Sequence, residues 1–189
     1  YMEWSQYVQA ELFRAMDLRR MNLDSMGPLE ERNSLSELIN GITEQIAHRL
    51  PATLSREILH KIVINEAVGL GPLEDLLADP SVSEIMVNRY DDIYVERSGR
   101  LERTGISFSS DSAVLSTIER IISPLGRRID ESSPMVDARL KDGSRVNAII
   151  PPLALRGPCL TIRKFSEKKL TTDDLLRYGS INEPMVEFL

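Results

Sequence analysis

Residues 135–150, which read MVDARLKDGSRVNAII, carry the pattern that decides the fold. Apolar residues alternate with polar or charged ones on both sides of the central Asp142-Gly143 pair, as they do in half-buried β-strands. An Asp-Gly pair between two such runs is a strong signal for the tight turn of a β-hairpin. Pro151-Pro152 then ends the second run. The stretch predicts an antiparallel hairpin with strands over 135–140 and 145–150.

The flanking residues extend this hairpin into a sheet. Residues 110–125 repeat apolar side chains at helical spacing and end at Gly126, a typical helix stop. A shorter helix is expected at Leu73–Leu77, closed by Asp79-Pro80. Further β-prone runs, separated by polar turns, lie at 83–88, 93–97, 101–108 and 159–165. We therefore expect an α/β domain with a mainly antiparallel sheet.

The first third of the chain is predicted to be helical. Apolar stripes with helical periodicity cover residues 3–20, 35–50 and 54–68, with a break at Met26-Gly27-Pro28. Ser34 and Glu37 have the spacing of a capping box, which would start the second helix. Short breaks between the stripes indicate three antiparallel helices. The expected fold class is thus α+β, an N-terminal antiparallel helical bundle followed by the α/β domain.

Composition limits the classes of protein to consider. Of the 189 residues, 42% are hydrophobic and 28% charged, as in a globular protein. The single cysteine, Cys159, excludes an internal disulfide framework, and two histidines add too little for a zinc site built from Cys and His. No apolar run approaches the roughly 20 residues that span a bilayer. Because the chain begins with Tyr1 and not with Met, we expect it to be part of a longer cytoplasmic protein.

Charge is unevenly distributed along the chain. The formal net charge is −6. Residues 1–119 hold 11 Lys and Arg against 20 Asp and Glu, whereas residues 120–169 hold 11 against 5. A basic segment inside an acidic chain suits a local anionic ligand or an acidic partner surface, and a solvated basic face is the alternative.

Several familiar sites can be set aside from the residues alone. The sequence has no Gly-Lys dipeptide and therefore no P-loop. Gly69-Leu70-Gly71-Pro72 reads as a structural turn, because Pro72 removes an amide donor that a phosphate would need. His48 and His60 read as surface or packing residues. Asp130-Glu131 pairs two carboxylates but is accompanied by no nucleophile motif.

The best site candidates are three arginines of the predicted sheet. Arg139 and Arg145 flank the Asp-Gly turn, where their side chains can point from one face of the sheet, and Arg163 lies in the last β-prone run. Guanidinium groups brought together repel one another unless an anion lies between them, and their planar forks suit phosphate oxygens. The alternative pairs Arg139 and Arg145 with the carboxylates of Asp137, Asp142 or Glu131 on a solvated face.

Six ordered segments within about residues 69–178 carry a resemblance to a known family. They are GLGPLEDLL (69–77), SEIMVN (83–88), GRRIDESSP (126–134), DARL (137–140), DGSRVN (142–147) and LTIRKF (160–165). They resemble the N-terminal domain of the CpaF-type ATPases, type II/IV secretion motors that drive assembly of tight-adherence (Flp-type) pili in bacteria. Arg89-Tyr90 departs from the family, which usually has a glycine there.

The resemblance implies a hexameric ring, driven by ATP and Mg²⁺, that is cytoplasmic and peripheral at the bacterial inner membrane. This chain would supply a helical region (1–68), a PAS-like N-terminal domain (69–165), and a linker with the start of a RecA-like C-terminal domain (166–189). Thr171 with Asp174 would cap a helix in that last part. The implied partners are the chain's own RecA-like domain, neighbouring subunits and an inner-membrane platform protein, with no nucleic acid.

The resemblance also assigns roles to residues. Arg145 and Arg163, and third Arg139, would reach the nucleotide phosphates across the cleft between the two domains. Arg127 and Arg128 are the next candidates for contacting the phosphates. The alternative for them is a structural role in the loop of Asp130-Glu131. The Walker motifs of the family belong to the C-terminal domain. The resemblance therefore implies no catalytic residue in this chain, which by itself requires no cofactor or metal.

Three other functions remain as alternatives. The chain could be an interaction module whose helices 1–65 dock on a membrane platform protein and whose sheet never touches nucleotide. A stand-alone PAS-like sensor is less well supported, because the sequence suggests no apolar ligand pocket. Nucleic-acid recognition is least supported, because the basic residues lack interleaved aromatic ones.

Overall fold

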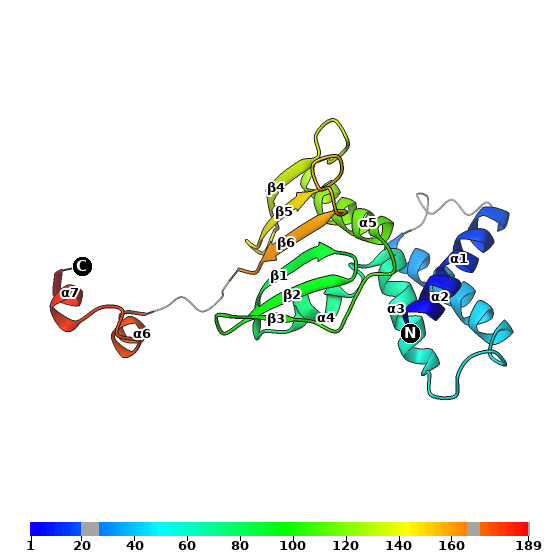
Figure 1. The fold of residues 1–189 in the computed structure, drawn as a ribbon, viewed down its shortest axis with the longest axis horizontal. Coiled ribbons are helices and arrows are strands. Elements are labelled where there is room, and N and C mark those ends of the chain that lie inside the picture. Colours follow the sequence, from blue (N-terminus) through cyan, green and yellow to red (C-terminus); the bar gives the residue numbers. More distant parts are fainter. Residues whose placement is uncertain (20–26, 166–170, 189) are drawn as a thin grey trace.

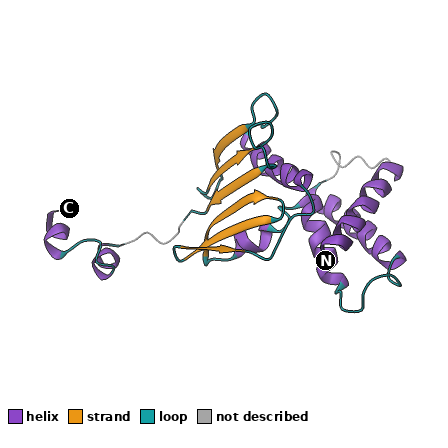
Figure 2. Ribbon diagram, in the orientation of Figure 1, coloured by secondary structure: helices purple, strands orange, loops and turns teal. Residues whose placement is uncertain are grey.

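The computed structural model describes residues 1–19, 27–165 and 171–188 (Figures 1 and 2). Three helices come first. The six strands of one sheet follow, together with further, shorter helices. The elements are α1 (Met2–Arg19), α2 (Pro28–Gln45), α3 (Arg56–Val68), α4 (Leu73–Ala78), β1 (Val82–Arg89), β2 (Asp92–Arg97), β3 (Arg100–Arg103), α5 (Asp111–Ile122), η2 (Ser123–Leu125), β4 (Met135–Arg139), β5 (Arg145–Ile149), β6 (Cys159–Arg163), α6 (Thr172–Arg177) and α7 (Glu183–Phe188). The predicted α+β fold class is confirmed.

The six strands form one antiparallel sheet in the order β3-β2-β1-β6-β5-β4. The hairpin predicted from residues 135–150 is β4 and β5, and Gly143 in its turn has a φ of +90°, which a glycine adopts without strain. Alternate residues of the strands enter a core with α4 and α5, among them Val146 and Ile162, both fully buried. The polar residues between them therefore point to the opposite face of the sheet.

A second hydrophobic core lies within the three-helix bundle. Helices α1, α2 and α3 contact one another and bury the apolar stripes seen in the sequence, including Val8, Leu12, Ile39, Leu59 and Val63. None of the helices in the described residues combines the length and apolar character needed to cross a membrane.

The predicted start of the second helix is wrong. Ser34 and Glu37 lie inside α2, which begins at Pro28 with Gly27 as its N-cap residue. Proline is favoured at the first helical position, and Glu30 and Glu31 in the first turn interact favourably with the helix dipole. These signals start the helix seven residues earlier than a capping box of Ser34 and Glu37 would, since that box places the first helical residue at Leu35.

The third strand is shorter than the predicted run 101–108. β3 ends at Arg103, and Thr104 then donates its backbone N–H to the carbonyl of Ile93 at 2.8 Å. The chain leaves the sheet edge because Phe108 is fully buried in the core, where its backbone N–H bonds the carbonyl of Tyr90 at 2.7 Å.

The turn at residues 69–72 joins the bundle to the sheet layer, as its structural interpretation predicts. Gly71 has a φ of +60°, and a Cβ there would lie 2.8 Å from the Phe108 ring. The Glu74 carboxylate accepts the backbone N–H of Leu70 at 2.9 Å. This turn thus needs glycine both for its backbone conformation and for its close approach to Phe108.

A buried polar cluster, which we call the Glu66 network, connects the bundle to the sheet layer. Glu66 on α3 is only 5% exposed and accepts the backbone N–H of Ser109 at 2.8 Å and the side-chain amide of Gln9 from α1. The Ser109 hydroxyl donates to the Gln9 carbonyl oxygen at 2.9 Å. Arg120 on α5 donates to the backbone carbonyls of Glu66, at 2.8 Å, and Gly69, and burial lowers its pKa. Helices α1, α3 and α5 are therefore connected by one set of hydrogen bonds where the bundle meets the sheet layer.

The chain beyond the sheet contains two short helices. Thr171 and Asp174 form the predicted capping box at the start of α6. In Figure 1, α6 and α7 lie apart from the sheet. Residues 166–170 of the predicted linker lie outside the described residues, as do Arg20 and Met26, so the division into 1–68, 69–165 and 166–189 stays a prediction.

Candidate anion-binding site

The three candidate arginines lie in one row across the sheet. Arg139 of β4 is paired in register with Arg145 of β5, which is paired in turn with Arg163 of β6. Residues paired in this way are direct neighbours and project from the same face. The structure thus brings together all three residues that the sequence singled out, and we call them the arginine row.

The row lies at the end of the sheet from which the chain continues toward α6. Arg139 and Arg163 are the last residues of β4 and β6, and Arg145 is the first of β5. The row points away from α4 and α5, because Val146 and Ile162 take the positions facing the core. In Figure 1, β6 ends at this end of the sheet, so the chain that follows β6 starts beside the arginine row.

Two carboxylates accompany the row. Asp137 of β4 accepts from Nε of Arg145 at 3.1 Å and from Nη2 at 2.5 Å. These hydrogen bonds hold the pKa of Asp137 below its ordinary value and raise the pKa of Arg145. Glu84 of β1 lies beside Arg163, with 3.5 Å between Oε2 and Nε. No ion pair is recorded for Arg139 among the described residues, so the charge of the row is only partly balanced.

This pairing partly matches the solvated-face alternative. Asp137, one of the three carboxylates considered from the sequence, is the partner of Arg145. Asp142 instead accepts the backbone N–H and the hydroxyl of Ser144 inside the hairpin turn. The sequence did not indicate Glu84 as a partner, because its position beside Arg163 depends on the pairing of β1 with β6.

The loop before β4 has a structural arrangement. Asp130 accepts hydrogen bonds from Ser132 and Ser133, which lower its pKa, and pairs with Arg128 at 3.2 Å. For Arg128 this supports the structural alternative. Arg127 is exposed next to it.

The histidines show no convergent chemistry. His60 lies within 2.9 Å of the Ser36 hydroxyl, as a packing residue between α3 and α2 would. Across residues 1–19, 27–165 and 171–188, no group of three His, Cys, Asp or Glu side chains is placed to hold a metal ion. The arginine row can bind and orient an anion, and the two carboxylates beside it, Asp137 and Glu84, are each paired with an arginine.

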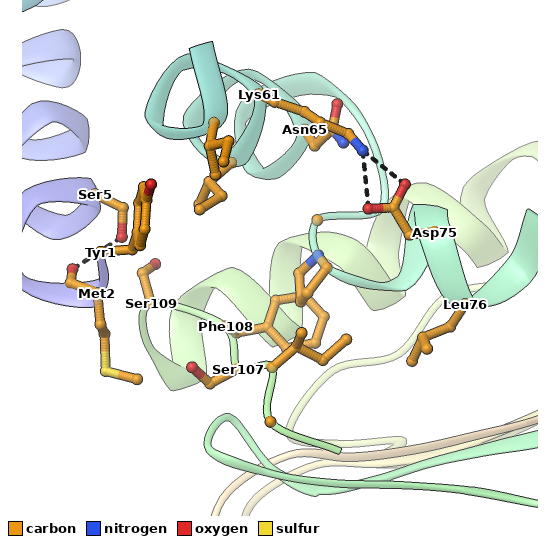
Figure 3. A pocket seen from close by; sticks show the side chains of 16 residues that line it. Tyr1, Met2, Ser5, Lys61, Asn65, Asp75, Leu76, Ser107, Phe108 and Ser109 are labelled. Carbon is orange, nitrogen blue, oxygen red and sulfur yellow. Dashed lines mark hydrogen bonds and ion pairs between the residues drawn. The ribbon is translucent and has the colours of Figure 1, made fainter. Parts of the chain in front are cut away.

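A pocket of about 590 Å³ lies elsewhere, between the bundle and the sheet layer (Figure 3). Tyr1 and Met2, just before and at the start of α1, line one side of it, the Lys61–Asp75 ion pair lies on another, and Phe108 also lines it. The sequence suggested no such pocket, because its walls come from segments far apart in the chain. None of the three arginines lines it.

Comparisons with known proteins give one family match and several similar proteins. Residues 66–189 match the family described as "Type II/IV secretion system protein". An uncharacterized protein of Methanocaldococcus jannaschii is 40% identical over 122 residues, which cover 64% of this chain and 17% of that protein. The type IV secretion system protein VirB11 of Brucella suis is 29% identical over 111 residues, covering 58% of this chain and 31% of VirB11.

A solved structure supports the same assignment. The VirB11 ATPase from the Brucella suis type IV secretion system, crystallised in complex with sulphate, has a TM-score of 0.51 and 26% sequence identity. The match covers 58% of this chain and 34% of that one. The chain therefore spans less than a third of the curated relatives' length and about a third of the VirB11 structure.

Proposed function

Since the chain belongs to the type II/IV secretion system protein family, we propose that it is the nucleotide-gating N-terminal region of a secretion ATPase. The observation that carries the proposal is the arginine row, which gathers three guanidinium groups at the end of the sheet where the chain continues. The family match extends over the sheet and beyond it, from residue 66 to residue 189.

The residues of the row fit the phosphates of ATP but not Mg²⁺. A guanidinium fork offers paired N–H donors to phosphate oxygens, and a row of three can follow the charge of a triphosphate. The nearby carboxylates of Asp137 and Glu84 already face arginines, so they are poor candidates for metal ligands. Mg²⁺ and the β- and γ-phosphates would be held by a P-loop, and this sequence has no such loop.

In the proposed mechanism the row acts on the nucleotide from across a cleft. Arg145 and Arg163 would bind phosphate oxygens of an ATP held by the RecA-like domain, with Arg139 as a third contact. Bound ATP provides the phosphoryl group whose transition state spreads negative charge over its oxygens. Guanidinium groups already in place stabilise that charge, as an arginine finger does.

The finer identity is part of the proposal. The six segments quoted above favour the CpaF-type branch, which assembles Flp-type pili for tight adherence. The partners would be the RecA-like domain, neighbouring subunits of a homohexamer and an inner-membrane platform protein. The assembled ring would lie on the cytoplasmic side of the bacterial inner membrane. The ATPase name of the Brucella suis relative supports the coarser assignment to a secretion ATPase.

A second candidate function is an interaction module that never contacts nucleotide. It is favoured by large apolar side chains exposed on the bundle, namely Phe13, Leu18 and Leu29. Such side chains, if they form one patch, mark a contact surface for another protein. The bundle could thus dock on a platform protein whether or not the arginine row binds phosphate.

ATP hydrolysis by this chain and by a longer protein that includes a P-loop domain tests the proposal. We expect no turnover above buffer from residues 1–189, because nothing in the sequence can cradle the β- and γ-phosphates around Mg²⁺. The longer protein should hydrolyse ATP. Turnover that scales with the concentration of the 189-residue chain and survives repurification would refute the assignment as a gating region.

A further inference from the structure

The pair of Asp137 and Arg145 has a specific geometry. Asp137 is paired in register with Asn147, so Arg145 is its diagonal neighbour on β5. Long side chains reach across that diagonal. The carboxylate engages Nε at 3.1 Å and Nη2 at 2.5 Å, which makes the contact bidentate and side-on.

Within residues 1–19, 27–165 and 171–188, this side-on contact leaves the other edge of the guanidinium free. A guanidinium has five N–H donors, and the side-on pair uses the Nε hydrogen and one Nη2 hydrogen. Both Nη1 hydrogens and the second Nη2 hydrogen remain for another acceptor, in the plane that the carboxylate has fixed. The Asp137 carboxylate therefore orients the Arg145 guanidinium and leaves three of its N–H donors for another acceptor.

The other members of the row are held less firmly. Arg163 faces Glu84 through a single contact of 3.5 Å, and the described residues provide no ion pair for Arg139. Arg145 is also the central member of the row, because it is paired in register with an arginine on each neighbouring strand. Without Asp137, repulsion by the guanidinium groups of Arg139 and Arg163 would act on an Arg145 side chain that can adopt many rotamers.

We infer that Asp137 is a positioning residue, which holds the guanidinium of Arg145 with its free edge presented to a phosphate oxygen. The inference rests on the proposed function, because it needs a nucleotide on the free edge. Holding the fork in one plane before the nucleotide binds removes most of the ordering that Arg145 would otherwise undergo during the reaction. Since Asp137 does not itself contact the phosphate, its effect must pass through Arg145.

The test uses the longer protein with its P-loop domain and measures kcat and KM for ATP. Asp137→Asn should lower kcat by up to about 100-fold, the loss that a misplacement of about 1 Å can cause, with KM changed far less. Asp137→Glu keeps the charge and should recover part of the loss. The double variant Asp137→Asn with Arg145→Ala should be no slower than Arg145→Ala alone, because the two residues act as one unit.

Glu131→Gln is the matched control, since Glu131 is an exposed carboxylate of the loop before β4. Its kcat should stay at the wild-type value. Wild-type kcat in Asp137→Asn, beside an impaired Arg145→Ala, would overturn the positioning role while leaving the proposed function standing. Fully multiplicative losses in the double variant would overturn it too. If Arg145→Ala itself retains wild-type turnover, the proposed function fails first.

Discussion

Replacing Arg145 or Arg163 by alanine in the longer protein is expected to lower ATP turnover by about 1,000-fold or more. Each guanidinium would stabilise charge that develops in the transition state, so the loss should appear mainly in kcat. Binding of ATP should weaken less, because a hydrogen bond to a charged group is worth only about 1.5–3 kcal/mol. Steady-state hydrolysis together with an equilibrium ATP-binding assay separates the two effects.

Two further variants make the arginine result specific. Arg145→Lys should not restore full turnover, because an ammonium keeps the charge but loses the planar fork. Arg100→Ala, at the exposed start of β3, should hydrolyse ATP as the wild type does. If the alanine variants at positions 145 and 163 also behave like the wild type, both are surface charges and the interaction module becomes the better account.

Replacing Glu66 by alanine is expected to lower the free energy of unfolding by about 1–3 kcal/mol. The change leaves the buried Ser109 N–H and the half-buried Gln9 amide without their acceptor. Glu66→Gln should also be destabilising, because its amide group turns an NH₂ toward one of those donors. Denaturant unfolding of the 189-residue chain measures both changes.

Glu37→Gln is the control for the Glu66 variants. Glu37 is exposed in the middle of α2 and is not part of a capping box, so its replacement should change stability by less than about 0.5 kcal/mol. If Glu37→Gln lowers the free energy of unfolding as much as the Glu66 variants do, both the Glu66 network and the revised start of α2 are contradicted.

Local patterns were sufficient to predict several elements. The Asp142-Gly143 turn, the Thr171–Asp174 capping box and the Gly69–Pro72 turn each depend on residues within a few positions of one another. The start of α2 was predicted wrongly although it is also local. Two helix-start signals competed there, and Pro28 with its two glutamates prevailed over Ser34 and Glu37.

Contacts between distant segments could not be predicted in this way. The hairpin places Arg139 opposite Arg145, but Arg163 joins the row only because β6 inserts between β5 and β1. Ser109 and Gln9 are 100 positions apart, and Ser109 and Glu66 are 43 apart, so no spacing rule indicates the Glu66 network. The pocket of Figure 3 was missed for the same reason.

A structure of the longer protein with Mg²⁺ and a non-hydrolysable ATP analogue is the most direct test of the central claim, that the arginine row contacts nucleotide. We expect Nη atoms of Arg145 and Arg163 at about 2.7–3.2 Å from phosphate oxygens, with Asp137 still on the Nε side of Arg145. Phosphates fully bound by the P-loop domain, with both guanidinium groups in solvent and more than about 4 Å away, would contradict it.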